Sequence, residues 1–270
     1  MYYNINNRQT PRKNPLTKER KTKMKKIIAI LLVVCFMFLA VGCSGTKADA
    51  GKGDDPKSEG VMTYAEYMAA AVDDKIVIEA FVQGKQSWWD NKATVYAADA
   101  DGAYFIYNMD CSEEDYAKLT NGTKIKVTGY KAEWAGEVEV AEGATFEIIE
   151  GSKYIASAVD VTAKLGTDEL IDFQNQLVAF NGLTVEASND DGATYLYKWD
   201  GSGSDGDDLY FSASLDGVTY TFMLESYLTD KDSAVYSAVK NLKVGDTIDM
   251  EGFLYWYEGM NPHITSVKVK

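Results

Sequence analysis

The sequence predicts a mainly β protein built from two related units in tandem. Aromatic residues make up 12% of the chain, with 18 Tyr and 22 Gly, and this composition favours strands over a helical bundle. Residues 122–136 align with residues 245–259 without a gap, at a constant offset of 123 positions. Each unit also has an Asp-Gly step between two β-type segments, at Asp101 and at Asp216, which is typical of a tight hairpin.

The predicted elements follow the same order in both units. A helix precedes the first unit, because Thr63 and Glu66 have the spacing of a capping box and an Ala-rich segment continues to Asp74. Each unit then contains a strand, a hairpin, a short helix and two further strands. The segments are residues 75–83, 92–99, 103–109, 112–119, 123–134 and 137–149 in the first unit, and 176–187, 208–214, 218–224, 232–242, 247–257 and 263–270 in the second.

The alternation of side chains along a strand predicts how each hairpin pairs. Counting outward from the Asp-Gly steps places Tyr96 opposite Tyr107 and Phe211 opposite Phe222. We expect these pairs to lie on the one bulky apolar face that each hairpin has. The outer face of the first hairpin is also apolar, and we expect it to pack against the second unit or the preceding helix, or else to dock a partner. Its residues are Val95, Ala97, Tyr104 and Ile106.

A helix between strands three and four of a five-stranded Greek-key barrel is the order of an OB fold. The chain resembles the extracytoplasmic OB-fold modules of bacterial lipoproteins, and tRNA-anticodon-like OB domains more broadly, over about residues 75–150 and 176–270. The Asp-Gly hairpin and the pattern Gly-x-x-Ile-x-[Val/Met]-x-Gly-[Tyr/Phe] carry the resemblance. It implies two tandem five-stranded OB-like Greek-key barrels, each with a short helix between strands three and four. It indicates a fold and not an activity.

The segment from Met24 to Cys43 has the features of an export signal. A short basic start precedes an apolar run of 15 residues, Ile27 to Val41, which is too short to span a membrane easily. The ending Leu-Ala-Val-Gly-Cys resembles a bacterial lipobox, although Ala40 stands where that family usually has Leu. The resemblance implies that Cys43 is lipidated and becomes the mature N-terminus. An ordinary signal peptide with a chance Cys, or an uncleaved anchor, is the alternative.

These signals predict four regions in the chain. Residues 1–42 are a leader and lipoprotein signal peptide, with Met24 as an alternative start, and residues 43–60 are a flexible tether. Residues 61–150 hold the N-terminal helix and first OB-like domain, and residues 151–270 a linker helix and the second. Residues 43–270 contain 18 basic and 40 acidic residues, a net charge of −22 that repels phosphate backbones.

Aromatic residues in loops are the candidate ligand-binding groups. Adjacent Trp side chains on a strand point apart, so at least one of Trp88 and Trp89 is hard to bury, and Asp90 and Asn91 beside them suit a sugar ring. Aromatic packing that caps the barrel ends is the alternative. The full set of candidates is Trp88, Trp89, Tyr104, Trp134, Tyr255 and Tyr257.

Metal, redox and catalytic signals are weak. The segment with Asp200, Asp205 and Asp207 resembles a calcium loop without the EF-hand spacing, and a solvated loop is the alternative. Cys111 is expected to be a half-buried residue beside a helix cap, with a reactive thiol or an intermolecular disulfide as the alternative. We expect His263 to be a surface residue rather than a base, and we find no enzyme motif and no cofactor site.

The sequence therefore predicts a non-catalytic lipoprotein on the extracytoplasmic face of a cell membrane, in a Gram-positive cell. Its expected role is a binding or adaptor module for a protein partner or an extracellular glycan. Nucleic acid is not expected, because neither hairpin has Lys or Arg over residues 93–109 or 209–224. The alternative is an oligonucleotide-binding OB-fold lipoprotein.

Overall fold

The computed structural model describes residues 57–270, which belong to one compact unit. The predicted signal segment, the alternative start at Met24, the lipidation site Cys43 and most of the tether lie outside the described residues. Among the residues described, no helix combines the length and the apolar character needed to cross a membrane.

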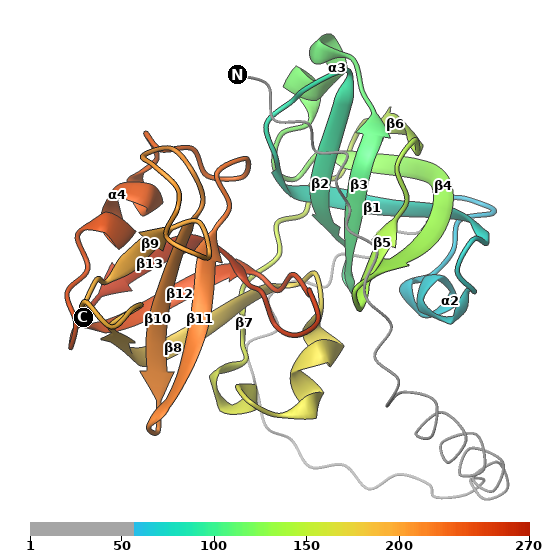
Figure 1. Ribbon diagram of the computed structural model, residues 1–270. Coiled ribbons are helices and arrows are strands. Elements are labelled where there is room, and N and C mark those ends of the chain that lie inside the picture. The colour runs from blue at the N-terminus through green and yellow to red at the C-terminus, as the bar shows by residue number, and fades with distance from the viewer. Residues whose placement is uncertain (1–56) are drawn as a thin grey trace, which may run out of the picture. The chain divides into compact units, whose positions relative to one another are not determined.

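The first barrel is a sheet with the strand order β1-β2-β3-β5-β4, closed by the pairing of β1 with β4 (Figure 1). Strand β1 pairs with both β2 and β4, and β5 pairs in parallel with β3 and antiparallel with β4. The fifth predicted strand is split, because β5 and β6 pair with different halves of β4. The elements are α2 (Tyr64–Ala69), β1 (Lys75–Lys85), β2 (Lys92–Ala98), β3 (Ala103–Asp110), α3 (Glu113–Lys118), β4 (Lys124–Trp134), β5 (Glu137–Val140) and β6 (Thr145–Ile149).

The second barrel repeats this topology. Strand β8 pairs with β10 and β12, and β13 closes the barrel between β12 and β11. Two 3-10 turns take the place of the expected linker helix. The elements are β7 (Val159–Asp160), η1 (Thr162–Lys164), η2 (Asp168–Phe173), β8 (Leu177–Glu186), β9 (Tyr195–Tyr197), β10 (Leu209–Leu215), β11 (Val218–Leu224), α4 (Ala234–Lys240), β12 (Thr247–Phe253) and β13 (His263–Val269).

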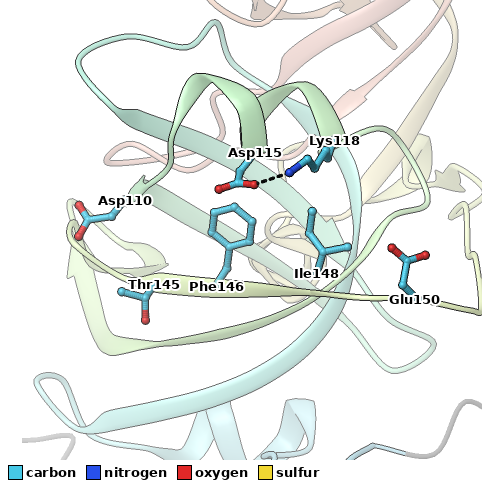
Figure 2. A pocket seen from close by; sticks show the side chains of 7 residues that line it. All are labelled: Asp110, Asp115, Lys118, Thr145, Phe146, Ile148 and Glu150. Carbon is cyan, nitrogen blue, oxygen red and sulfur yellow. Dashed lines mark hydrogen bonds and ion pairs between the residues drawn. The ribbon is translucent and has the colours of Figure 1, made fainter.

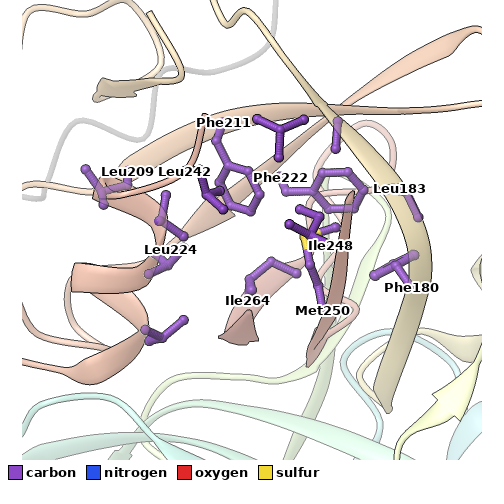
Figure 3. Packing of buried hydrophobic residues seen from close by; sticks show 14 of the residues in the cluster. Phe180, Leu183, Leu209, Phe211, Phe222, Leu224, Leu242, Ile248, Met250 and Ile264 are labelled. Carbon is purple, nitrogen blue, oxygen red and sulfur yellow. The ribbon is translucent and has the colours of Figure 1, made fainter. Parts of the chain in front are cut away.

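The repeated sequence positions take equivalent places in the two barrels. Side chains from β8, β10, β11, β12, β13 and α4 fill the second barrel (Figure 3). Ile125 in β4 and Ile248 in β12 are both fully buried, as predicted. The repeated glycines Gly129 and Gly252 lie where the chain crosses a neighbour, because a Cβ at either would come within 2.8 Å of another atom. The repeat thus preserves core packing and close backbone contacts.

The second hairpin pairs as predicted. Phe211 lies opposite Phe222, and both side chains belong to the barrel core. The turn consists of Asp216 and Gly217, whose φ angles are 51° and 81°. Two positive φ angles are the signature of the two-residue turn that an Asp-Gly step favours.

The first hairpin pairs differently, and the predicted register was wrong. Tyr96 lies opposite Phe105 and not Tyr107. The turn is centred one residue earlier than the Asp-Gly step, because the Asp99 N–H donates to the Gly102 carbonyl at 2.9 Å and Ala98 pairs with Ala103. The Asp99 carboxylate also accepts two hydrogen bonds from backbone N–H groups of the turn. A side chain rather than positive φ angles therefore shapes this turn.

The assignment of faces in this hairpin was also wrong. The predicted outer residues belong to the barrel core: Val95, Ala97, Tyr104 and Ile106. Tyr96 and Phe105 lie on the outer face instead, where they form a separate cluster with Phe253. Both faces of the hairpin are buried, one by its own barrel and one by the second barrel, so side-chain alternation did not distinguish them. Tyr104 does pack against α2, as expected, with its ring 5.1 Å from that of Tyr67.

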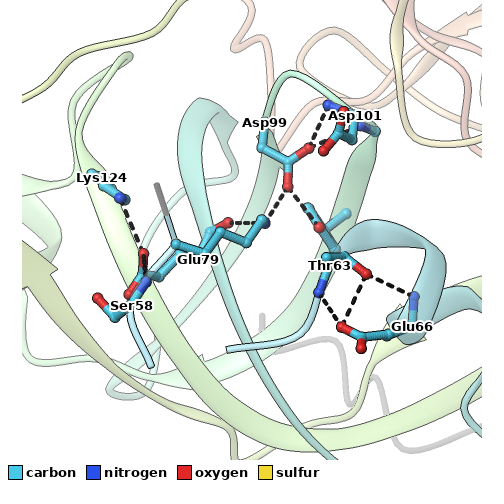
Figure 4. A network of polar contacts seen from close by, with 10 residues as sticks. Ser58, Thr63, Glu66, Glu79, Asp99, Asp101 and Lys124 are labelled. Carbon is cyan, nitrogen blue, oxygen red and sulfur yellow. Dashed lines mark hydrogen bonds and ion pairs between the residues drawn. The ribbon is translucent and has the colours of Figure 1, made fainter. Parts of the chain in front are cut away.

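The N-terminal helix and the segment before it are fixed to the first barrel by polar contacts (Figure 4). Thr63 and Glu66 form the predicted capping box, although the helix ends at Ala69 and does not reach Asp74. Lys57 donates to Asp99 at 2.5 Å. Glu79 pairs with the buried Lys124 at 3.0 Å and accepts a bond from the Ser58 N–H. The described part of the tether therefore lies along the barrel.

Candidate functional site

OB folds bind ligands on the outer face of their second and third strands and in the adjoining loops. In the first barrel this face is covered by the second barrel. Tyr96 is fully buried, and the Phe253 ring stacks on it at 4.2 Å between centroids with 4° between the planes. The Tyr255 ring packs edge-on against Phe105 at 5.2 Å. The first barrel therefore has no open OB face in this structure.

A polar cluster lies at the edge of this contact. The Tyr96 hydroxyl is 2.9 Å from Nδ1 of His263, which lies 3.4 Å from the Glu225 carboxylate. Gln86 donates to the same carboxylate at 2.7 Å. His263 is buried, so its prediction as a surface residue was wrong. Burial, together with the nearby Glu225 charge, raises the pKa of Tyr96, which keeps its hydroxyl available as a hydrogen-bond donor.

In the second barrel the corresponding face is open. Ser212 and Ser214 on β10 lie opposite Thr221 and Thr219 on β11. The two threonines are exposed and the two serines are partly exposed. At its β8 side, the Glu186 carboxylate accepts a hydrogen bond from the Ser214 hydroxyl at 2.6 Å. The face offers hydroxyl groups, with one carboxylate beside them.

Three exposed aromatic residues lie in the loops near these faces. We call Trp89, Tyr227 and Trp199 the loop aromatics; they are 54%, 53% and 75% exposed. Trp89 lies between β1 and β2 and Trp199 between β9 and β10. Each is in the loop between the first and second strands of its barrel, which is one of the loops that OB folds use for ligands. Tyr227 lies between β11 and α4.

Hydrogen bonds join the three loops to one another. The Ser87 N–H donates to the Tyr227 carbonyl at 2.7 Å. Ser226 donates from its N–H and its hydroxyl to one Asp208 oxygen, at 2.8 and 2.7 Å. The Lys198 N–H donates to the Asp208 carbonyl at 2.9 Å. The loop aromatics are therefore carried by one connected set of loops that includes both barrels.

The predicted aromatic candidates are divided by the structure. Trp89 and Tyr257 are exposed, and Trp88 is half-buried with its Nε1 donating to the Cys111 carbonyl at 2.9 Å. Trp134 is half-buried too. Tyr255 stacks on His263 at 4.7 Å and belongs to the contact between barrels.

Tyr104 is fully buried and donates to Asp99 at 2.7 Å, so its side chain cannot contact a ligand in this structure. Trp199 and Tyr227 were missed in the sequence. Trp199 stands next to the predicted acidic loop, and this was the one signal that could have found it. Cys111 is buried beside the α3 cap, and burial raises its thiol pKa to about 11.

The acidic loop of the second barrel does not gather its carboxylates. Asp205 pairs with Lys240 at 2.6 Å, and Asp207 lies 3.6 Å from Lys198. Asp200 accepts a hydrogen bond from the Ser202 N–H. Within residues 57–270, no group of three or more ligating side chains is placed to hold a metal ion. The carboxylates of this loop are therefore paired with Lys198, with Lys240 of α4 and with the loop backbone.

A surface pocket of about 570 Å³ lies between α3 and β6 (Figure 2). Phe146 and Ile148 form its apolar floor. Asp115 pairs with Lys118 at 2.9 Å, and two further carboxylates lie on the rim, those of Asp110 and Glu150. Three carboxylates against one lysine disfavour a phosphate ligand here.

Comparisons with known proteins found matches among solved structures. No protein-family model matches the chain, and no curated protein matches its sequence. Solved structures match over 73–74% of the chain at 11–12% identity. They include the Ifi202 HINa domain in complex with dsDNA (97% of that chain, TM-score 0.34) and a murine DNA binding protein bound with dsDNA (98%, TM-score 0.33). A replication protein A heterotrimer bound to ssDNA matches over 49% of its chain with a TM-score of 0.32.

These comparisons correct two expectations from the sequence. A protein partner or glycan as the ligand is contradicted, and so is the exclusion of nucleic acid, because the three structures named above are bound to DNA. The alternative, an oligonucleotide-binding OB-fold lipoprotein, agrees better with them. The exclusion depended on the absence of basic residues from both hairpins, which concerns phosphate contacts and not contacts to bases. At this identity the likeness is one of fold.

Proposed function

We propose that this chain is a non-catalytic protein that binds single-stranded oligonucleotides. The observation that carries the proposal is the set of loop aromatics: Trp89, Tyr227 and Trp199 are exposed on connected loops of an OB-fold pair. Bases stack on such side chains with about 1–3 kcal/mol each, without regard to sequence. The hydroxyl-lined face of β10 and β11 adds donors and acceptors for base edges.

The charge of the chain decides how a nucleic acid would lie on it. Residues 43–270 carry 40 acidic residues, 18 lysines and no arginine. Lys198 and Lys240, which are near the Trp199 loop, lie beside aspartates. Phosphates should therefore point to solvent while bases face the protein. Added salt screens the repulsion, so binding should hold or improve with salt, opposite to binding through phosphate contacts.

The proposal includes the location of the protein in the cell. The segment from Met24 to Cys43 supports export and lipidation at Cys43. The protein would then lie on the extracytoplasmic face of a cell membrane, where the tether gives it reach and its acidic surface keeps it away from anionic headgroups. No cofactor is included in this role.

Fluorescence anisotropy of a labelled oligothymidylate tests the proposal on the mature chain made without its lipid. Trp199→Ala and Trp89→Ala should each weaken binding about 5- to 150-fold, the equivalent of one lost base stack. Tyr130→Ala is the matched control, since Tyr130 is 56% exposed on β4 and lies outside the three loops. Failure of the wild type to bind at any salt concentration would refute the proposal, as would equal losses in the control.

A further inference from the structure

The two barrels meet at a junction built from buried polar side chains. The hairpin between β4 and β5 lies against the segment just before β8. Gln174 accepts from the Val138 N–H at 2.9 Å and donates to the Gly136 carbonyl at 2.8 Å. Asn175 donates from Nδ2 to the Val138 carbonyl at 3.0 Å. Two side chains thus pair with the edge of β5 as a neighbouring strand would.

Glu137 lies at the centre of this junction. Its side chain is fully buried, and Oε2 accepts a hydrogen bond from the Trp256 N–H of the second barrel at 2.9 Å. In the described part of the chain, Oε1 of Glu137 and Oδ1 of Asn175 have no donor. A buried acceptor without a donor destabilises the closed junction, because it has lost its hydrogen bonds to water. A proton on Oε1 would make that oxygen a donor, and the Asn175 side chain, which interacts with the Glu137 carboxyl group, has Oδ1 free to accept.

The surroundings of Glu137 favour its protonated form. Burial raises its pKa to about 8, and the hydrogen bonds that it accepts oppose this only in part. Glu139 of the same strand acts in the same direction as burial. The groups that face it from other elements are tyrosines, Tyr64 and Tyr67 of α2 and Tyr96 of β2, and its charge would raise their pKa. None of these neighbours offers a positive charge.

We propose that Glu137 is a proton-operated latch between the two barrels. Its carboxyl group keeps a proton, shared with Oδ1 of Asn175, while the junction is closed. When the proton leaves, an unpaired charge remains in the buried junction, and the loop at Trp256 separates from the first barrel.

The pH dependence of the latch follows from linkage. The ordinary glutamate pKa of 4.5 applies to the open junction, where water reaches the carboxyl group, and about 8 applies to the closed one. A raised pKa in the closed state means that closure is most stable below pH 4.5 and is lost as the pH rises through about 8. The open population should therefore grow about tenfold per pH unit across this window and level off above it.

Hydrogen exchange of the Trp256 amide measures the open population directly. In the mature chain, the exchange rate, corrected for its intrinsic pH dependence, should rise about tenfold per pH unit toward pH 8. Glu137→Gln keeps a neutral side chain that both donates and accepts, so its corrected rate should not change with pH. Glu133→Gln, an exposed position on the same hairpin, should behave like the wild type. A flat profile in the wild type, or a slope that persists in Glu137→Gln, would overturn the proposal.

Infrared difference spectroscopy provides a test that needs no stable variant. The wild type should show the C=O band of a protonated carboxyl group at pH 6–7, and the band should disappear above about pH 8. A spectrum without that band at neutral pH would also overturn the latch. In either test, the oligonucleotide proposal stands or falls separately, since no loop aromatic takes part in the junction.

Discussion

Phe253 packs between the two barrels, and we expect this contact to couple their unfolding. It ends β12, is buried, and stacks on Tyr96 of the first barrel. Its ring also faces β1, because a Cβ built at Gly84 would lie 2.8 Å from the Phe253 Cε2 atom. Removing this ring leaves a cavity between the barrels while both barrel interiors keep their own side chains.

Phe253→Ala should lower the free energy of unfolding by about 3–5 kcal/mol, as other buried Phe→Ala changes do. The stacked pair with Tyr96 accounts for about 0.5–1.5 kcal/mol of this. The rest is lost burial and the cavity. Because the loss falls on the contact between barrels, the coupling of their unfolding should weaken as well.

Denaturant unfolding followed by far-UV circular dichroism and Trp fluorescence tests both expectations. The wild type should show one transition with both probes, whereas Phe253→Ala should show a lower midpoint and two separated steps. Tyr257→Ala is the control, because Tyr257 is an exposed aromatic of the following loop and should change stability by less than about 0.5 kcal/mol. A loss below about 1 kcal/mol in Phe253→Ala, with the single transition kept, would refute the role given to this contact.

Three further predictions concern other parts of the chain. Gly252→Ala would place a Cβ 2.4 Å from the backbone oxygen of His263, which cannot move without breaking the β12–β13 pairing, so the melting temperature should fall by the equivalent of about 1–3 kcal/mol or more. Glu79→Gln leaves the buried Lys124 without its carboxylate and should cost about 3–5 kcal/mol. Burial alone would raise the pKa of Glu79, but hydrogen bonds from Ser58 and Lys124 lower it overall, so its contribution, present above pH 4.5, should be lost in acid melts of the wild type and not of the variant. Cys43→Ala should release the protein from the membrane into the medium, and membrane retention equal to that of the wild type in cell fractionation would contradict lipidation.

The fold could be predicted where local chemistry determines it. The Asp216-Gly217 turn fixes the second hairpin through its two positive φ angles, and its register followed from the sequence. Thr63 and Glu66 form their capping box from neighbouring atoms alone. The repeat around Ile125 and Ile248 was visible because packing requires the same residue types in both barrels.

What could not be predicted depends on contacts between distant parts of the chain. The outer face of the first hairpin is apolar because a second barrel covers Tyr96 and Phe105, and the alternation of a strand does not reveal such a cover. The candidate site could not be predicted from the sequence for the same reason. Ser87 and Tyr227 are 140 positions apart, and only the folded barrels bring their loops together. Tyr227 carried no local signal of exposure.

The two barrels differ at their equivalent faces, and under the proposed function this separates effects on stability from effects on binding in future mutants. The β2–β3 face of the first barrel is aromatic and is occupied by the second barrel, with Phe253 in the place where a base would stack. The β10–β11 face, lined by residues such as Ser212 and Thr221, is open and rich in hydroxyl groups. Changes at Tyr96 should therefore alter unfolding, and oligonucleotide affinity only through unfolding. Changes at Thr221 should alter oligonucleotide affinity without changing the free energy of unfolding. If changes at Tyr96 altered affinity directly and changes at Thr221 altered only unfolding, the barrels would have to separate before they bind.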